Sequence, residues 1–174
     1  MKKHNGMRPQ DVVVLLKIAA KKQPWQMKDL AVELMISNSE ISESINRSVQ
    51  AGLIAADKKT LMIGALLEFL HHGLKYVYPQ HPGAIIRGIV TAHSANPLKK
   101  LIHSNDDYVW SWPEGNVRGQ SIQPLHPSVP AACLKDQELY ELLALTDALR
   151  IGKKREQEIA FKELEKKQIG RAHV

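Results

Sequence analysis

The chain has 174 residues, of which 44% are hydrophobic and 24% are charged, and its formal net charge is +6. This composition is typical of a globular protein and excludes a disordered or fibrous chain. The excess of positive charge suits a polyanionic partner, such as a nucleic acid or an anionic membrane surface. A single cysteine, Cys133, excludes a disulfide within the chain and a cysteine-based zinc cluster.

No segment reaches the roughly 18 apolar residues that a membrane-spanning helix needs. The first residues are basic, but no apolar core of a secretory signal follows them. We therefore expect a cytoplasmic protein with no membrane partner.

Three helices are predicted in the first 50 residues, at 8–22, 26–35 and 38–50. Pro9 suits the first turn of the first helix, and its apolar residues cover a broad face. In the second, Leu30, Ala31 and Leu34 share one face of a short helix.

The third helix carries the clearest start and stop signals. Ser37, followed three residues later by Glu40, forms the pattern of a capping box, and Gly52 is placed to end the helix. Apolar residues recur every four positions, so this side should face the core. The residues expected to face outward are Asn38, Ser39, Ser42, Glu43, Asn46 and Arg47.

A short hairpin is predicted at 53–62 and a fourth helix at 62–72, which Gly73 ends. The order of three helices, a hairpin and a helix is that of a winged helix-turn-helix domain. We therefore place such a domain at 8–73.

The remaining chain, 74–174, is predicted as a loop-rich segment followed by helices. Short extended pieces are expected at Lys75–Tyr78, Ile85–Val90 and Asn116–Ile122, and helix at 136–168 with a division at Gly152. The fold class expected for the whole chain is mainly α, with a few short strands.

The N-terminal segment resembles MarR-like bacterial regulators over about residues 8–72. The resemblance lies in Leu30-Ala31-x-x-Leu34-x-Ile36-Ser37-x-Ser39-x-Ile41-Ser42-x-x-Ile45, closed by Ala51-Gly52-Leu53-Ile54. It implies a transcriptional regulator that binds double-stranded DNA as a dimer. Glu43 and Ser48 depart from the pattern, since a basic and an apolar residue, respectively, are usual there.

The expected DNA contacts lie on the third helix, on the helix before it and in the hairpin. Asn and Arg side chains can read adenine and guanine through paired hydrogen bonds, and lysines can hold phosphates. The candidate DNA-binding residues are Asn38, Ser39, Ser42, Asn46, Arg47, Lys28, Lys58 and Lys59. Lys2 and Lys3 form a possible basic arm.

Three other interpretations stay open. The winged helix is alternatively a protein-interaction module, such as an antitoxin-like partner of a toxin or enzyme, with residues 74–132 as the docking region. Leucines of the C-terminal helices (Leu139, Leu142, Leu143 and Leu149) offer a surface for a homodimer. An active site around His103, Asp106 and Asp107 has little support, so we expect no enzyme activity, no metal and no cofactor.

Overall fold

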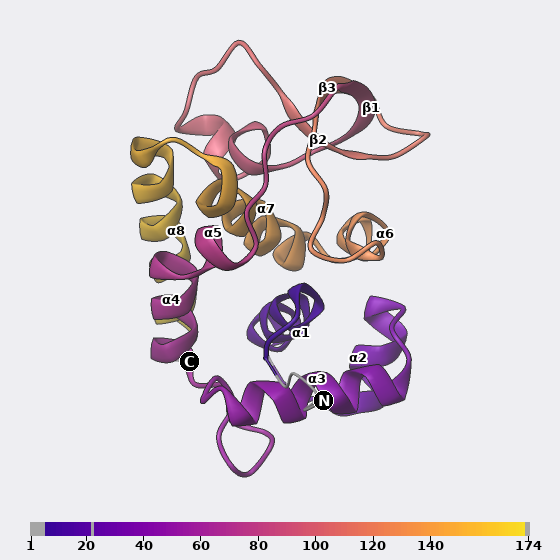
Figure 1. The fold of residues 1–174 in the computed structure, drawn as a ribbon, viewed down its shortest axis with the longest axis vertical. Coiled ribbons are helices and arrows are strands. Elements are labelled where there is room, and N and C mark those ends of the chain that lie inside the picture. The colour runs from indigo at the N-terminus through magenta and orange to yellow at the C-terminus, as the bar shows by residue number, and fades with distance from the viewer. Residues whose placement is uncertain (1–5, 22, 173–174) are drawn as a thin grey trace, which may run out of the picture.

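Figure 1 shows a computed structural model of the chain, which describes residues 6–21 and 23–172. The described residues form helices α1 (Pro9–Ala20), α2 (Met27–Leu34), α3 (Asn38–Gln50), α4 (Ile63–His72), α5 (Leu74–Val77), α6 (Val129–Leu134), α7 (Gln137–Ile151) and α8 (Lys154–Ala172). Three strands, β1 (Ile85–Val90), β2 (Tyr108–Ser111) and β3 (Val117–Ser121), and two short 3-10 helices, η1 (Ala92–Ser94) and η2 (Leu98–Lys100), lie between α5 and α6. The mainly α composition with short strands agrees with the prediction.

The predicted helices correspond to α1, α2, α3, α4 and the pair α7–α8, and Gly152 separates the last two as expected. The extended piece expected at Lys75–Tyr78 is wrong, because this segment forms α5. The N–H groups of Tyr76 and Val77 donate to the Gly73 carbonyl, and the turn buries Leu74 completely. Strand β2 was not predicted, because Val109 and Trp110 are both buried and the segment shows no alternation.

Helix α1 is the central element of the N-terminal half (Figure 1). It packs against α2 and α3 on one side and against α7 on the other. Its apolar residues occupy its whole circumference, and Val12–Leu16 are at most 1% exposed. A helix that is apolar all round is one that is enclosed by the rest of the molecule.

The three strands form a small sheet in which each strand pairs with both others. β1 is antiparallel to β2 and to β3, and β2 and β3 pair in parallel. Two glycines permit this close packing: a Cβ on Gly88 would lie 1.9 Å from the Trp110 carbonyl oxygen, and one on Gly115 would lie 2.2 Å from that of Gly88. Any larger residue at these positions would force the backbones apart.

Helix α7 lies between the sheet and α1 (Figure 1). The Asp147 carboxylate is fully buried and accepts hydrogen bonds from Thr91 Oγ1 (2.8 Å), Trp110 Nε1 (2.8 Å) and Arg150 Nη1 (3.0 Å). Burial raises the pKa of the Asp147 carboxyl, and these three donors oppose that shift. The network fixes the sheet to the helix.

The interpretation of the α7 leucines as a dimer surface is wrong. Each of them is at most 3% exposed within the single chain (Leu139, Leu142, Leu143 and Leu149). They pack in the core together with α1, so they offer nothing to a second copy.

One continuous core extends across the boundary expected near residue 73. It includes buried residues of α1, α3 and α4 together with residues of the sheet, α7 and α8. The segments 8–73 and 74–174 are therefore packed against each other through apolar side chains. None of the helices in the described residues is long and apolar enough to cross a lipid bilayer.

Candidate nucleic-acid interface

Helices α2 and α3 are joined by a tight turn of three residues. Met35 adopts a left-handed conformation (φ 56°) and ends α2, Ile36 is buried beneath the turn, and Ser37 begins α3. Ser37 Oγ accepts the Glu40 N–H at 3.2 Å, so the predicted N-cap is confirmed. Small and apolar residues bury the crossing of the helices (Ala31, Leu34, Ile41 and Ile45).

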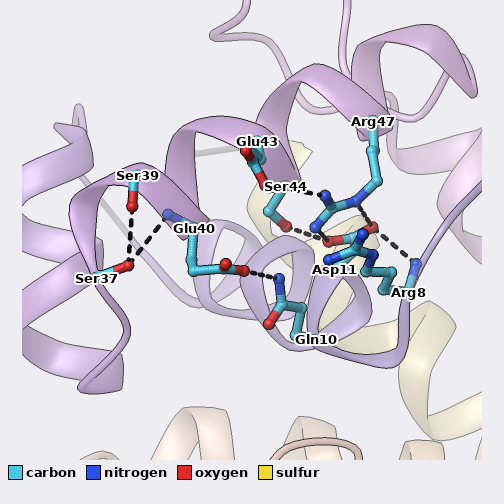
Figure 2. A network of polar contacts seen from close by, with 9 residues as sticks. All are labelled: Arg8, Gln10, Asp11, Ser37, Ser39, Glu40, Glu43, Ser44 and Arg47. Carbon is cyan, nitrogen blue, oxygen red and sulfur yellow. Dashed lines mark hydrogen bonds and ion pairs between the residues drawn. The ribbon is translucent and has the colours of Figure 1, made fainter. Parts of the chain in front are cut away.

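The second half of the predicted capping box is replaced by a contact to α1. Glu40 Oε2 accepts a hydrogen bond from Gln10 Nε2 at 2.8 Å, as Figure 2 shows. Glu40 therefore joins α3 to α1 and is tied to a neutral partner. Its carboxylate is directed toward α1, away from the exposed residues Asn38, Ser39 and Asn46.

Most of the predicted contact residues on α3 face outward. Asn38, Ser39 and Asn46 are exposed and Ser42 is half-buried. Asn38, Ser42 and Asn46 make no side-chain hydrogen bond to other described residues, so their donors and acceptors are available. Ser39 Oγ lies 3.2 Å from Ser37 Oγ.

Arg47 is the exception, and its expected role as an outward-facing base reader is wrong in this structure. Its guanidinium makes a paired contact with the buried Asp11 carboxylate, with Nε 2.8 Å from Oδ2 and Nη2 2.8 Å from Oδ1 (Figure 2). Only 10% of the Arg47 side chain is exposed, and none of Asp11. The hydrogen bond to Asp11 raises the pKa of Arg47.

The Asp11 carboxylate is completely satisfied by its surroundings. Besides Arg47, it accepts hydrogen bonds from Ser44 Oγ (2.5 Å) and from the Arg8 backbone N–H (2.8 Å). This cluster fixes α3 to the start of α1 (Figure 2). Sequence reasoning missed Asp11, although an acid beside an unbroken apolar run was the available signal.

The hairpin after α3 is short, with one bridge pairing Ile54 with Leu61. Its tip is organised by Asp57, which accepts the backbone N–H groups of Lys59 and Thr60 and the Thr60 hydroxyl. The Thr60 and Lys59 hydrogen bonds lower the pKa of Asp57. The hairpin therefore presents a defined loop conformation.

The three predicted lysines differ in their surroundings. Lys59 Nζ lies 3.3 Å from the Trp25 carbonyl oxygen and 4.7 Å from the centre of the Trp25 ring, so it anchors the hairpin to the start of α2. Lys58, at the tip with φ 59°, and Lys28 on α2 are exposed and form no ion pair with described residues. Lys2 and Lys3 lie outside the described residues.

The resulting surface is polar rather than strongly basic. The exposed side of α3 carries amides and hydroxyls, one exposed acid (Glu43) and no exposed cation. Exposed positive charge lies on the neighbouring elements, at Lys28 of α2, Lys58 of the hairpin and Arg8 before α1. Such a surface can form hydrogen bonds to base edges, with phosphate contacts at its margins.

The other sites considered from the sequence gain no support. His103, Asp106 and Asp107 are exposed, and among the described residues no group of three His, Cys, Asp or Glu side chains converges on a possible metal position. The Cys133 thiol is buried, and this burial raises its pKa. Ser48, unusual for the resembling pattern, is fully buried, and its Oγ lies 3.9 Å from Met7 Sδ.

No family model matches the chain, and comparisons with curated proteins and with solved structures also find no match.

Proposed function

We propose that the chain is a winged helix-turn-helix regulator that binds double-stranded DNA, with α3 in the major groove. The observation that carries this proposal is the set of unpaired polar side chains on the outer side of a buried, capped helix. Amides and hydroxyls along one helix, next to a basic hairpin, match what a groove offers.

The proposal assigns separate tasks to separate residues. Asn38 and Asn46 read base edges, Ser39 and Ser42 contact bases or phosphates, and Lys58 and Lys28 hold phosphates. Arg47 does not contact the DNA and keeps α3 in place through Asp11. Lys59 fixes the hairpin through Trp25.

Binding should depend on salt less steeply than in strongly basic regulators, because few cations lie at this surface. Each phosphate neutralised contributes about −0.9 to the slope of log K against log salt concentration. Lys28 and Lys58, the two cations assigned to phosphates, therefore account for about two units of slope, and Glu43 reduces the attraction further.

The test is fluorescence anisotropy of the purified full chain with duplex DNA from upstream of its own gene, against a scrambled duplex, at two salt concentrations. Asn46→Ala should cost about 1–3 kcal/mol on the specific duplex and much less on the scrambled one. Lys58→Ala should weaken both duplexes alike and reduce the salt slope by about one unit.

Lys99→Ala is the control, because this exposed lysine lies in η2, far from α3 in the chain and in the fold. It should leave specific binding unchanged. Absence of binding to either duplex at low salt by the folded protein would contradict the proposal. An equal loss on both duplexes from Asn46→Ala would contradict base reading by that residue.

A further inference from the structure

The sheet places two arginines directly opposite each other. Arg87 of β1 pairs with Arg118 of β3 in an antiparallel register, and both side chains are exposed. Residues directly opposite on such strands have Cβ atoms about 4.5–5.5 Å apart, and like charges there are destabilising. The folded chain therefore carries an unfavourable pair at a defined position.

Nothing in the described part of the chain neutralises this pair. Neither guanidinium has an ion pair or a side-chain hydrogen bond, whereas Arg47 and Arg150 are each bound to a buried aspartate. The acids of the neighbouring loops, Asp106, Asp107 and Glu114, are also unpaired with either arginine. The two positive charges are thus available to a partner.

An apolar residue lies next to the arginines on the same side of the sheet. Alternate residues of a strand share one side, so Ile85 accompanies Arg87, and Gln120 accompanies Arg118. Ile85 and Gln120 are themselves opposite each other, and Ile85 is 64% exposed. We call these four residues, Ile85, Arg87, Arg118 and Gln120, the arginine patch.

The location of the patch separates it from the proposed DNA surface. Figure 1 shows the sheet at one end of the long axis and α3 with the hairpin at the other end. A straight duplex lying on α3 would not reach the sheet, because DNA is stiff over lengths shorter than about 150 base pairs. The arginine patch therefore remains free when α3 is occupied.

The surroundings favour carboxylates of a protein over a nucleic-acid backbone. A nucleic acid needs an extended track of cations, and Asp106, Asp107 and Glu114 in the loops beside this sheet interrupt such a track, whereas a short acidic segment needs only the two guanidiniums. Two adjacent guanidiniums suit one or two carboxylates through paired hydrogen bonds. The exposed Ile85 side chain offers apolar contact that phosphates and sugars use poorly.

We propose that the arginine patch binds an acidic segment of a partner protein, in which carboxylates flank an apolar side chain. The carboxylates bind the guanidiniums of Arg87 and Arg118 and relieve the repulsion between these two arginines. The apolar side chain of the partner covers Ile85. The chain then presents DNA contacts at one end and a protein-docking surface at the other.

The test uses the full chain and a fluorescein-labelled peptide, acetyl-Gly-Glu-Leu-Glu-Glu-Leu-Gly-amide, followed by anisotropy at low salt. The double variant Arg87→Gln/Arg118→Gln should weaken peptide binding by about tenfold or more, since it removes charge-assisted hydrogen bonds. Its thermal midpoint should not fall, because the like-charge pair is lost. A peptide with glutamine in place of glutamate should not bind.

The matched control is Lys99→Gln/Lys100→Gln, which removes the same net charge from exposed residues outside the arginine patch. Its peptide affinity should stay within about twofold of that of the unchanged chain. Duplex DNA binding through α3 should be retained by both double variants, which separates this proposal from the proposed function. The proposal is overturned by absence of peptide binding, by an equal loss in the control, or by a patch that binds an oligonucleotide in place of the peptide.

Discussion

Two buried aspartates each hold separate parts of the chain together. Asp11 joins α1 to α3 through Arg47 and Ser44, and Asp147 joins α7 to the sheet through Trp110 and to Thr91. A buried carboxylate is tolerated only when a counter-charge and hydrogen-bond donors surround it. Both aspartates meet this condition, so they specify positions of helices and strands as well as stabilising them.

Arg47→Met should destabilise the protein by about 3–5 kcal/mol, because it leaves the Asp11 charge buried without its cation. Methionine keeps the packing of the side-chain stem. Asp11→Asn/Arg47→Met should be less destabilised than Arg47→Met alone, since no charge is then left unpaired. Urea unfolding followed by circular dichroism measures both. A double variant at least as unstable as the single one would show that the pairing is not the cause.

The prediction of Arg47 as an outward residue shows what periodicity misses. Arg47 lies at the edge of the apolar side of α3, next to the buried Ser48, and a long side chain at an edge can turn either way. Its direction is set by Asp11, 36 residues earlier in the chain. Patterns within α3 contain no information about that partner.

The helices of eight or more residues could be predicted from the sequence because their signals are local, whereas the short helices α5 and α6 were not predicted. Ser37 caps α3, Gly52 follows it with φ 80°, and Gly152 ends α7, as their positions in the sequence indicated. The sheet is different, because β1, β2 and β3 are stabilised by pairing between residues up to 35 positions apart in the sequence, as between Ile85 and Gln120. Only β1 and β3 show an extended pattern, and the close approach through Gly88 and Gly115 requires the folded structure.

Gly88→Ala should destabilise the protein by about 2–4 kcal/mol, because its methyl group would overlap the Trp110 backbone. The sheet would have to open between β1 and β2. Gly64→Ala is the matched control: nothing lies within 4 Å of a Cβ at this position in α4, and alanine favours the helix. Equal urea midpoints for the two variants would contradict the packing seen between the strands.

At the scale of the whole molecule, a buried cation connects helices that are far apart in the sequence. Lys17 of α1, 6% exposed, lies 2.5 Å from Asp136 Oδ2 at the start of α7 and 3.2 Å from Glu33 Oε2 of α2. Burial disfavours the charged form of Lys17, but the hydrogen bonds and charges of Asp136 and Glu33 outweigh it and raise its pKa. Because of this contact and the shared core, we expect the two halves of the chain to unfold as one cooperative unit.

Asp136→Asn tests this connection through its pH dependence. Burial opposes ionisation of Asp136, but hydrogen bonds from Lys17 and from the Leu139 N–H outweigh it, so the pKa of Asp136 is lowered. A carboxyl with a lowered pKa stabilises the folded state above its unfolded pKa, and this stability is lost as the pH falls through the folded pKa. The single side-chain oxygen of asparagine can keep the cap of α7, but the substitution removes the charge and the Oδ2 acceptor of Lys17.

The variant should therefore be less stable than the unchanged chain by about 1–2 kcal/mol at pH 7, and the difference should disappear in acid, where Asp136 is protonated in both states. Circular dichroism reports the helices of both halves, and tryptophan fluorescence reports all three tryptophans: Trp25, buried in the first half, and Trp110 and Trp112 in the second. Because one core joins the halves, both signals should shift together. Lys166→Gln, at a side chain that is 73% exposed, should change little at either pH. A difference that persists unchanged in acid, or separate midpoints for the two signals, would mean that Lys17 and Asp136 do not couple the halves through charge.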